Sequence, residues 1–178
     1  MSPGRVDPRI CRRRPAGFPI PNDPIHAPTI PLTIAGGRPY NKYRIVPRGP
    51  MDVSGKRRIL IGAGGLSLRA EIYENETGDV ILKRLPVTGR ANRWGEEIYF
   101  SIPVSLTCAP DARVIVRKGE LGYWPDGNAL CIFFGKTPVS RGDEIRAASP
   151  VNIFGMIIDD PTELTAVDDG SPVIVERA

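Results

Sequence analysis

Six consecutive apolar residues, at positions 129–134, constrain the fold of this chain more than any other feature. Successive side chains of a β-strand point to opposite faces, so a strand that is apolar throughout is buried on both faces. Just before it, Pro125, Asp126 and Gly127 have the chemistry of a tight turn, since proline fixes φ, aspartate bonds its own backbone and glycine accepts positive φ. Residues 122–138 are therefore predicted to hold a turn followed by a central strand.

Side-chain parity predicts two faces for this strand and for an alternating segment at residues 96–102. In residues 129–134 the even-numbered side chains share one face and the odd-numbered side chains share the other. In residues 96–102 the even-numbered apolar side chains face a core, and the opposite face carries Glu97, Tyr99 and Ser101.

The first 56 residues form a Pro/Arg-rich extension that differs in composition from the remaining domain, residues 57–178. Eleven of the 19 prolines lie in the first 50 positions, and such repeated proline excludes a helix and interrupts a central strand. We therefore expect an extended or partly disordered segment. Three alternatives stay open: a ligand for an aromatic groove of a partner, edge strands at residues 30–34 or 44–46, and a functional chain that starts at Met51.

Charge and hydropathy limit the partners that we expect. Residues 1–50 carry nine Lys/Arg and two Asp, hence +7, whereas residues 51–178 carry fifteen Lys/Arg and eighteen Asp/Glu, hence −3. A mildly acidic domain argues against a nucleic-acid surface, although Arg12, Arg13 and Arg14 form a basic triplet in the extension. No apolar run approaches the ~20 residues that span a bilayer, and no apolar segment of a secretory signal follows the triplet, so no membrane partner is expected.

The reactive residues are few and scattered. The three cysteines, Cys11, Cys108 and Cys131, do not have the number or spacing of a disulfide framework or a zinc site. Cys131 is expected as a small buried apolar residue. His26 is the only histidine and lies in the extension, so no Ser-His-Asp or Cys-His mechanism is expected. We predict no metal, no cofactor, and a reduced, cytoplasmic protein.

The rest of the domain is predicted to consist of short strands and two small helices. Residues 62–65 are Gly-Ala-Gly-Gly and are expected as a hairpin turn, because the Gly-Lys-Ser/Thr ending of a phosphate-binding loop is missing. One helix is predicted at residues 77–85 with Thr77 as its cap, and a second begins at Asp160. The further strands are at residues 58–61, 66–73, 113–116, 152–158 and 172–176. About eight strands predict a mainly β domain, folded as a closed or nearly closed barrel.

Two sequence blocks carry a resemblance to a known family. They are Trp94-Gly95-Glu96-Glu97-Ile98-Tyr99-Phe100 and a second block from Gly122-Tyr123-Trp124-Pro125 to Phe133-Phe134-Gly135-Lys136-Thr137-Pro138. Over residues 57–177 the chain resembles the prokaryotic cyclophilin-like family of unknown function. This resemblance implies a closed eight-stranded β-barrel of the cyclophilin type with helices at its ends.

A weaker similarity to true cyclophilins does not extend to their catalytic residues. Residues 124–127 and 134–136 are similar to the Trp-x-Asp-Gly and Phe-Gly-Lys motifs of those enzymes. Cyclophilins polarise the prolyl amide with an arginine in a Phe-x-Arg context and also use a glutamine. This chain has no glutamine and no Phe-x-Arg sequence. We therefore assign no catalytic residue.

The candidate ligand-binding residues are aromatic and polar side chains of the two blocks. Tyrosine and tryptophan combine apolar area with a polar group, as binding pockets require. Packing is the alternative for the aromatic residues, and a solvated surface carboxylate is the alternative for the glutamate. The candidates are Trp94, Glu97, Tyr99, Tyr123, Trp124, Phe134, Lys136 and Thr137.

Two classes of function follow from these residues. We favour a binding module without catalysis, in which an aromatic-rimmed groove takes a peptide segment or a small molecule. The alternative is a divergent peptidyl-prolyl isomerase or another weak enzyme built on Glu97, Tyr99 and Lys136. A subunit of a larger assembly, including a homo-oligomer, is a third expectation.

Overall fold

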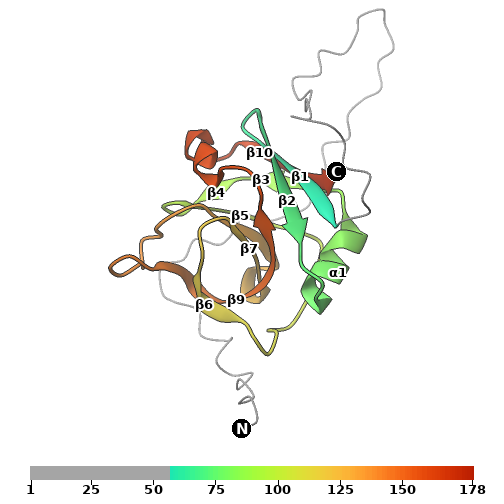
Figure 1. Ribbon diagram of the computed structural model, residues 1–178, viewed down its shortest axis with the longest axis horizontal. Helices are drawn as coiled ribbons and strands as arrows, with labels where there is room; N and C mark the ends of the chain where they lie inside the picture. The colour runs from blue at the N-terminus through green and yellow to red at the C-terminus, as the bar shows by residue number, and fades with distance from the viewer. Residues whose placement is uncertain (1–56) are drawn as a thin grey trace, which may run out of the picture.

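The computed structural model describes residues 57–178, which form a strongly curved antiparallel β-sheet with one α-helix at its edge (Figure 1). The predictions made for residues 1–56 lie outside the described residues. The mainly β class is confirmed. The strands are β1 (Arg58–Ala63), β2 (Leu66–Ile72), β3 (Val87–Arg90), β4 (Asn92–Arg93), β5 (Glu97–Ser101), β6 (Arg113–Val116), β7 (Glu120–Trp124), β8 (Ala129–Phe133), β9 (Ile145–Ile157) and β10 (Pro172–Arg177).

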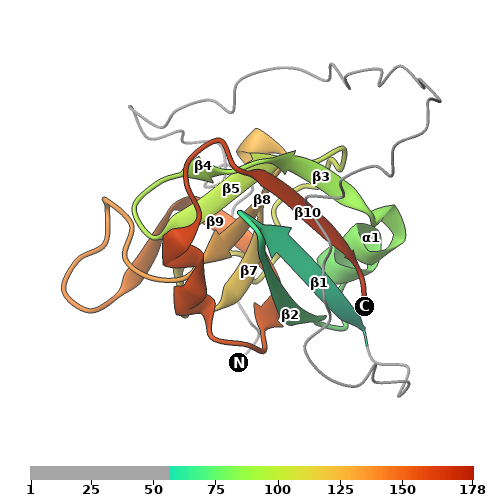
Figure 2. The same ribbon diagram turned by 90° about the horizontal axis from the view of Figure 1, so that it is seen from above.

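The strands pair in the order β3-β10-β1-β2-β9-β7-β8-β5-β4, and β6 pairs with β9 beside this path. The β1–β2 hairpin turns at Gly64 and Gly65, which both adopt positive φ, so residues 62–65 are a turn as predicted. Figure 2 shows β10, β1 and β2 side by side, with α1 next to one end of β10. The hairpin of β7 and β8 lies at the middle of the other half of the sheet.

The closed eight-stranded barrel is not supported, because the path of paired strands is open. β3 pairs with β10 and β4 pairs with β5, but within residues 57–178 no ladder joins β3 to β5. The two ends of the path meet on one chain segment, since only Ala91 separates β3 from β4. At this junction a Cβ on Gly89 would lie 2.5 Å from Cδ2 of Phe100, so the Phe100 ring packs directly on the glycine. Side-chain packing covers the position where backbone pairing stops.

The predicted side-chain parity is confirmed, and each face of the central strands has its own apolar cluster. The even-numbered side chains of β5 and β8, and that of Phe134, belong to the main core enclosed by the sheet. The odd-numbered side chains Tyr99, Ala129, Cys131 and Phe133 belong to a smaller cluster on the opposite face. We call this second group the outer cluster; its buried members are Tyr99, Val116, Trp124, Ala129, Cys131, Phe133, Ala147 and Val151.

Strand β9 covers the outer cluster, and it is longer than the sequence pattern predicted. A strand was expected only at residues 152–158, whereas β9 is Ile145–Ile157. Its second half pairs with β7 and β2, and residues 145–151 pair with β6 instead. Because Ala147 and Val151 contact the outer cluster, the first half of β9 covers the outer face of β7 and β8. The outer face of the central strands is therefore not a solvent-exposed surface.

The two helices begin near the predicted residues, with one correction. Helix α1 (Glu76–Arg84) is capped by Asn75, whose Oδ1 accepts a hydrogen bond from Gly78 N at 2.8 Å, and not by Thr77. Thr77 is inside the helix and is buried. The second element is a 3-10 helix, η3 (Pro161–Ala166), and Asp160 caps it through Thr162 N at 2.9 Å, as predicted.

The turn at η2 (Pro125–Gly127) places its positive φ at Asn128, where φ is 45°, and not at Gly127. A Cβ on Gly127 would lie 2.3 Å from the Trp124 ring, so glycine is required there by the close approach of that ring. The turn glycine therefore serves the placement of Trp124 rather than the backbone conformation.

The cysteines differ in state. Cys131 is a free, buried thiol on β8, as predicted. Cys108, in the loop between β5 and β6, is disulfide-bonded, which the cysteine spacing did not predict.

Candidate functional site

The two sequence blocks singled out by the resemblance contact each other directly. Glu96 N donates to Lys136 O at 2.9 Å, and the Glu96 carboxylate accepts from Lys136 N at 2.8 Å. Glycine is needed on both sides, because a Cβ on Gly95 would lie 2.7 Å from Lys136 O and a Cβ on Gly135 would lie 2.0 Å from Glu96 Oε2. These contacts fix the start of β5 against the end of β8. Glu96 is thus a structural residue, and Glu97 is the one that faces the outer cluster.

Glu97 is buried at 2% exposure on the outer face of β5, and its Oε2 has no hydrogen-bond partner among the described residues. Burial raises the pKa of Glu97 to about 8, and the neighbouring Cys131 thiol opposes this rise. The carboxyl is consequently mostly protonated at neutral pH and below. A buried polar atom without a partner is rare in folded proteins and requires an explanation.

Glu120 is the matched comparison, because it is equally buried at 2% exposure but fully paired. Its carboxylate accepts from Arg113 Nη2 at 2.7 Å and from Arg117 N at 2.8 Å. The described residues therefore supply hydrogen-bond donors to both carboxylate oxygens of Glu120. They supply none to Oε2 of Glu97. Perturbed, unpaired carboxyls of this kind mark candidate functional positions.

Glu97 lines a small pocket between the outer face of β7 and β8 and the first half of β9. The pocket is too narrow to admit a water molecule in this conformation. Ala148 is its one partly exposed member, so the pocket approaches the surface there. The other residues that line it are buried: Trp124, Cys131, Ala147, Ser149 and Val151.

Trp124 is held in this pocket by two neighbours. Its indole Nε1 donates to Ser149 Oγ at 2.7 Å, and its ring meets that of Tyr99 edge-to-face with centroids 6.5 Å apart. Burial and the nearby Glu97 raise the pKa of Tyr99 to about 12. Burial also raises the pKa of the Cys131 thiol, and Glu97 raises it further. The site therefore holds a carboxyl, a thiol, a phenol and a hydroxyl in an apolar setting.

The structure brings together only some of the predicted site residues. Glu97, Tyr99 and Trp124 converge on the outer cluster, and Trp94 packs against it while partly exposed. The other predicted residues lie elsewhere: Tyr123 and Phe134 in the main core, and Lys136 and Thr137 in the loop after β8.

Each of these four outlying residues makes its contacts outside the outer cluster. The Tyr123 hydroxyl donates to Val104 O at 2.8 Å. The Arg93 guanidinium lies over the Phe134 ring, with Cζ 5.3 Å from the ring centroid. Lys136 is exposed and approaches Asp143 at 3.4 Å. Thr137 Oγ1 donates to Arg146 O and so ties the loop after β8 to the start of β9.

Sequence reasoning missed Ala147, Ala148 and Ser149, because residues 145–151 were not predicted as a strand. Their period-2 pattern is weak, since small and polar residues fill both faces and Pro150 interrupts the segment. Two small residues and a serine opposite a tryptophan are typical of a surface that leaves room for another group. No local sequence signal identified that surface.

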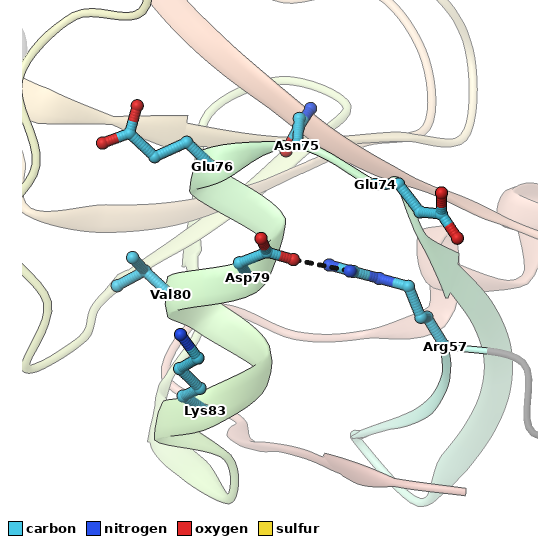
Figure 3. A pocket seen from close by; sticks show the side chains of 7 residues that line it. All are labelled: Arg57, Glu74, Asn75, Glu76, Asp79, Val80 and Lys83. Carbon is cyan, nitrogen blue, oxygen red and sulfur yellow. Dashed lines mark hydrogen bonds and ion pairs between the residues drawn. The ribbon is translucent and has the colours of Figure 1, made fainter.

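A larger pocket, of about 550 Å³, lies beside α1 and is open to solvent (Figure 3). Arg57 reaches across it to Asp79, with Nη1 and Oδ1 at 2.5 Å. Apart from Val80, its walls are charged or polar: Arg57, Glu74, Asn75, Glu76, Asp79 and Lys83. Ligand pockets are mostly apolar with a few convergent polar groups, so we do not place the site here.

A metal-binding cluster and a membrane-spanning helix are both absent from residues 57–178. No three His, Cys, Asp or Glu side chains there are close enough together to hold a metal ion. No helix in this part of the chain is both long and apolar enough to cross a membrane.

Comparison with known proteins identifies the family. The sequence profile described as "Cyclophilin-like" matches residues 57–176, and the chain belongs to that family. A hypothetical protein, AF2241 from Archaeoglobus fulgidus, solved in solution, is 40% identical and superposes with a TM-score of 0.60; the match covers 69% of this chain and 95% of that one. No curated protein sequence matches this chain. The prediction of a cyclophilin-like domain is confirmed.

Proposed function

We propose that this domain is a binding module that takes a peptide segment or a small molecule between β9 and the outer face of β7 and β8. The observation that carries the proposal is Glu97 Oε2, a buried carboxyl oxygen at the wall of a pocket that has no hydrogen-bond partner among residues 57–178. The indole of Trp124 and the hydroxyl of Ser149 supply the apolar surface and the second polar group that ligand pockets combine.

Opening of the pocket requires movement of the β9 segment that covers it. Residues 145–151 pair with β6 alone along this stretch, and the β6 ladder is interrupted between Arg113 and Ile115. A segment held by one short, irregular ladder separates from the sheet at lower free energy than the second half of β9, which pairs with both β7 and β2. The ligand is expected to enter beside Ala148.

A thermal-shift screen of the full chain against peptides and small molecules tests the proposal. A ligand at 100 times its dissociation constant stabilises the fold by about 2.7 kcal/mol, which raises Tm by several degrees. The hit is then repeated with Ala148→Leu, which fills the entrance, and with Glu74→Gln, which alters the pocket beside α1. Binding lost only in Ala148→Leu supports the proposed site; binding lost only in Glu74→Gln, or no hit at all, contradicts it.

Peptidyl-prolyl isomerisation is the second candidate, because the chain belongs to the cyclophilin-like family. The chain contains no glutamine, and none of the described residues that line the pocket around Glu97 is an arginine. We therefore expect no acceleration of prolyl isomerisation in a peptide assay with excess protein. Cytoplasmic location and self-association remain predictions, to be tested by counting free thiols in the native source and by measuring the mass in solution.

A further inference from the structure

The unpaired oxygen of Glu97 restricts what chemical group a ligand can place in the pocket. A buried carboxyl oxygen is satisfied by an N–H or O–H donor or by a positive charge. Among the described residues none of these reaches Oε2. Glu120, with its arginine and its backbone donor, shows what the same side chain has when the fold itself completes the site.

Within residues 57–178, the titratable groups that face Glu97 are the Cys131 thiol on β8 and the Tyr99 phenol on β5. The first half of β9 faces the pocket with Ala147, Ala148 and Ser149, and β7 faces it with Trp124. Neither of these two elements brings a charged side chain to the pocket wall. No described residue that lines the pocket is therefore a cation that competes with an incoming one.

We infer that the pocket takes a primary ammonium group on an unbranched aliphatic stem, such as a lysine side chain, with the ammonium paired to Glu97. This inference rests on the proposed function and names the anchoring group of its ligand. The stem would contact Ala147 and Val151, and the ammonium would donate to Glu97 Oε2 and to the remaining lone pair of Ser149 Oγ. The indole face of Trp124 adds an electrostatic attraction for a cation.

The number of acceptors favours an ammonium over a guanidinium. An ammonium has three donors on one nitrogen, whereas a guanidinium has five donors spread over a rigid plane. The pocket wall offers one carboxyl and one hydroxyl, and it is narrow. A guanidinium would leave several of its donors buried without acceptors, which costs about 1–3 kcal/mol for each group.

Binding of the ammonium is coupled to release of a proton from Glu97. Burial raises the pKa of the empty site to about 8, so the carboxyl is mostly protonated at neutral pH. An adjacent positive charge favours the ionised form and lowers that pKa. Affinity is therefore expected to rise about tenfold per pH unit between pH 6 and pH 8 and to level off above pH 8.

The experiment is isothermal titration calorimetry of the full chain with N-acetyl-lysine methylamide. The probes for comparison are the norleucine analogue, which lacks the ammonium, and the arginine analogue. A ligand of this size gains on the order of 0.3 kcal/mol per heavy atom, so a dissociation constant near 1 mM is expected for lysine. Norleucine and arginine are expected to bind at least tenfold more weakly. Repetition in buffers of different ionisation enthalpy counts the released proton, with about one expected at pH 6.5.

Glu97→Gln keeps the shape of the side chain and removes its ionisation. This variant is expected to lose the preference for lysine over norleucine and the release of a proton, whereas Glu74→Gln is expected to keep both. Equal binding of lysine and norleucine, a preference that survives in Glu97→Gln, or no binding of lysine at any pH from 6 to 9 would each overturn the inference.

The same titrations separate this inference from the proposed function. If a hit from the ligand screen binds wild-type protein and Glu97→Gln equally, yet is blocked by Ala148→Leu, the site exists and the ammonium anchor is wrong. If nothing binds and Ala148→Leu has no effect on any probe, both proposals fail.

Discussion

The carboxyl of Glu97 and the thiol of Cys131 are both buried in one pocket wall beneath the covering segment of β9, on the neighbouring strands β5 and β8. Neither group is ionised easily, since burial raises the pKa of both. The protein therefore keeps two acidic groups neutral in an apolar layer where valine or leucine would pack without an electrostatic cost.

The stability of the fold should fall as the pH rises past this pair. The pKa of Glu97 rises from 4.5 to about 8 on folding, so the folded state holds an extra proton between these values. The raised pKa contributes roughly 5 kcal/mol to the free energy of unfolding. This contribution is complete below pH 4.5 and is lost as the pH rises to about 8. In urea unfolding, Glu97→Gln should match wild type at pH 5 and be more stable at pH 9. Equal stability of the two proteins at both pH values would show that Glu97 is solvated.

The indole of Trp124 should depend on Ser149 for its position. Ser149→Ala removes the acceptor of the Nε1 hydrogen bond and should destabilise the fold by about 1–2 kcal/mol. Ser149→Thr keeps a hydroxyl at this position and serves as the matched control. The change in free energy is measured by denaturant titration, and tryptophan emission reports the indole environment. A loss in the threonine variant as large as that in the alanine variant would point to packing rather than the hydrogen bond.

Gly135 and Glu96 should show energetic coupling. A Cβ at Gly135 would overlap the Glu96 carboxylate, which then cannot accept from Lys136 N. Gly135→Ala should cost about 1–3 kcal/mol in wild type. In the Glu96→Ala background the same change should cost at least 0.5 kcal/mol less, because the overlapping group is gone. Strict additivity in this double-mutant cycle would contradict the contact.

The Cys131 thiol should be inert in the native protein. It is 1% exposed, and its raised pKa leaves almost no thiolate at neutral pH. Iodoacetamide at pH 8 should modify it only at the rate of unfolding, and modification should become fast in denaturant. A rapid native reaction would instead indicate frequent separation of β9 from β8 and β7. In that case, a bound ligand that closes the segment should slow the reaction.

From the sequence alone, the burial of both faces of β8 could be predicted, because six apolar residues in a row have no other stable placement in a sheet. The sequence also predicted which side chains of β5 share a face, the helix at α1 and the cap at Asp160. It failed at β3, β4 and the first half of β9, where short segments rich in small or polar residues have no clear period. These elements form because partner strands far away in the chain supply their hydrogen bonds.

The candidate site shows the same division. The alternation at residues 97–101 determined that Glu97 and Tyr99 point away from the main core, since the strand period of two leaves no choice. Local sequence carries no information about what lies opposite that face. Only the tertiary structure decided that β9 covers it, that Ser149 binds Trp124 there, and that no described residue donates to Glu97 Oε2, because these depend on contacts between residues 25 or more positions apart.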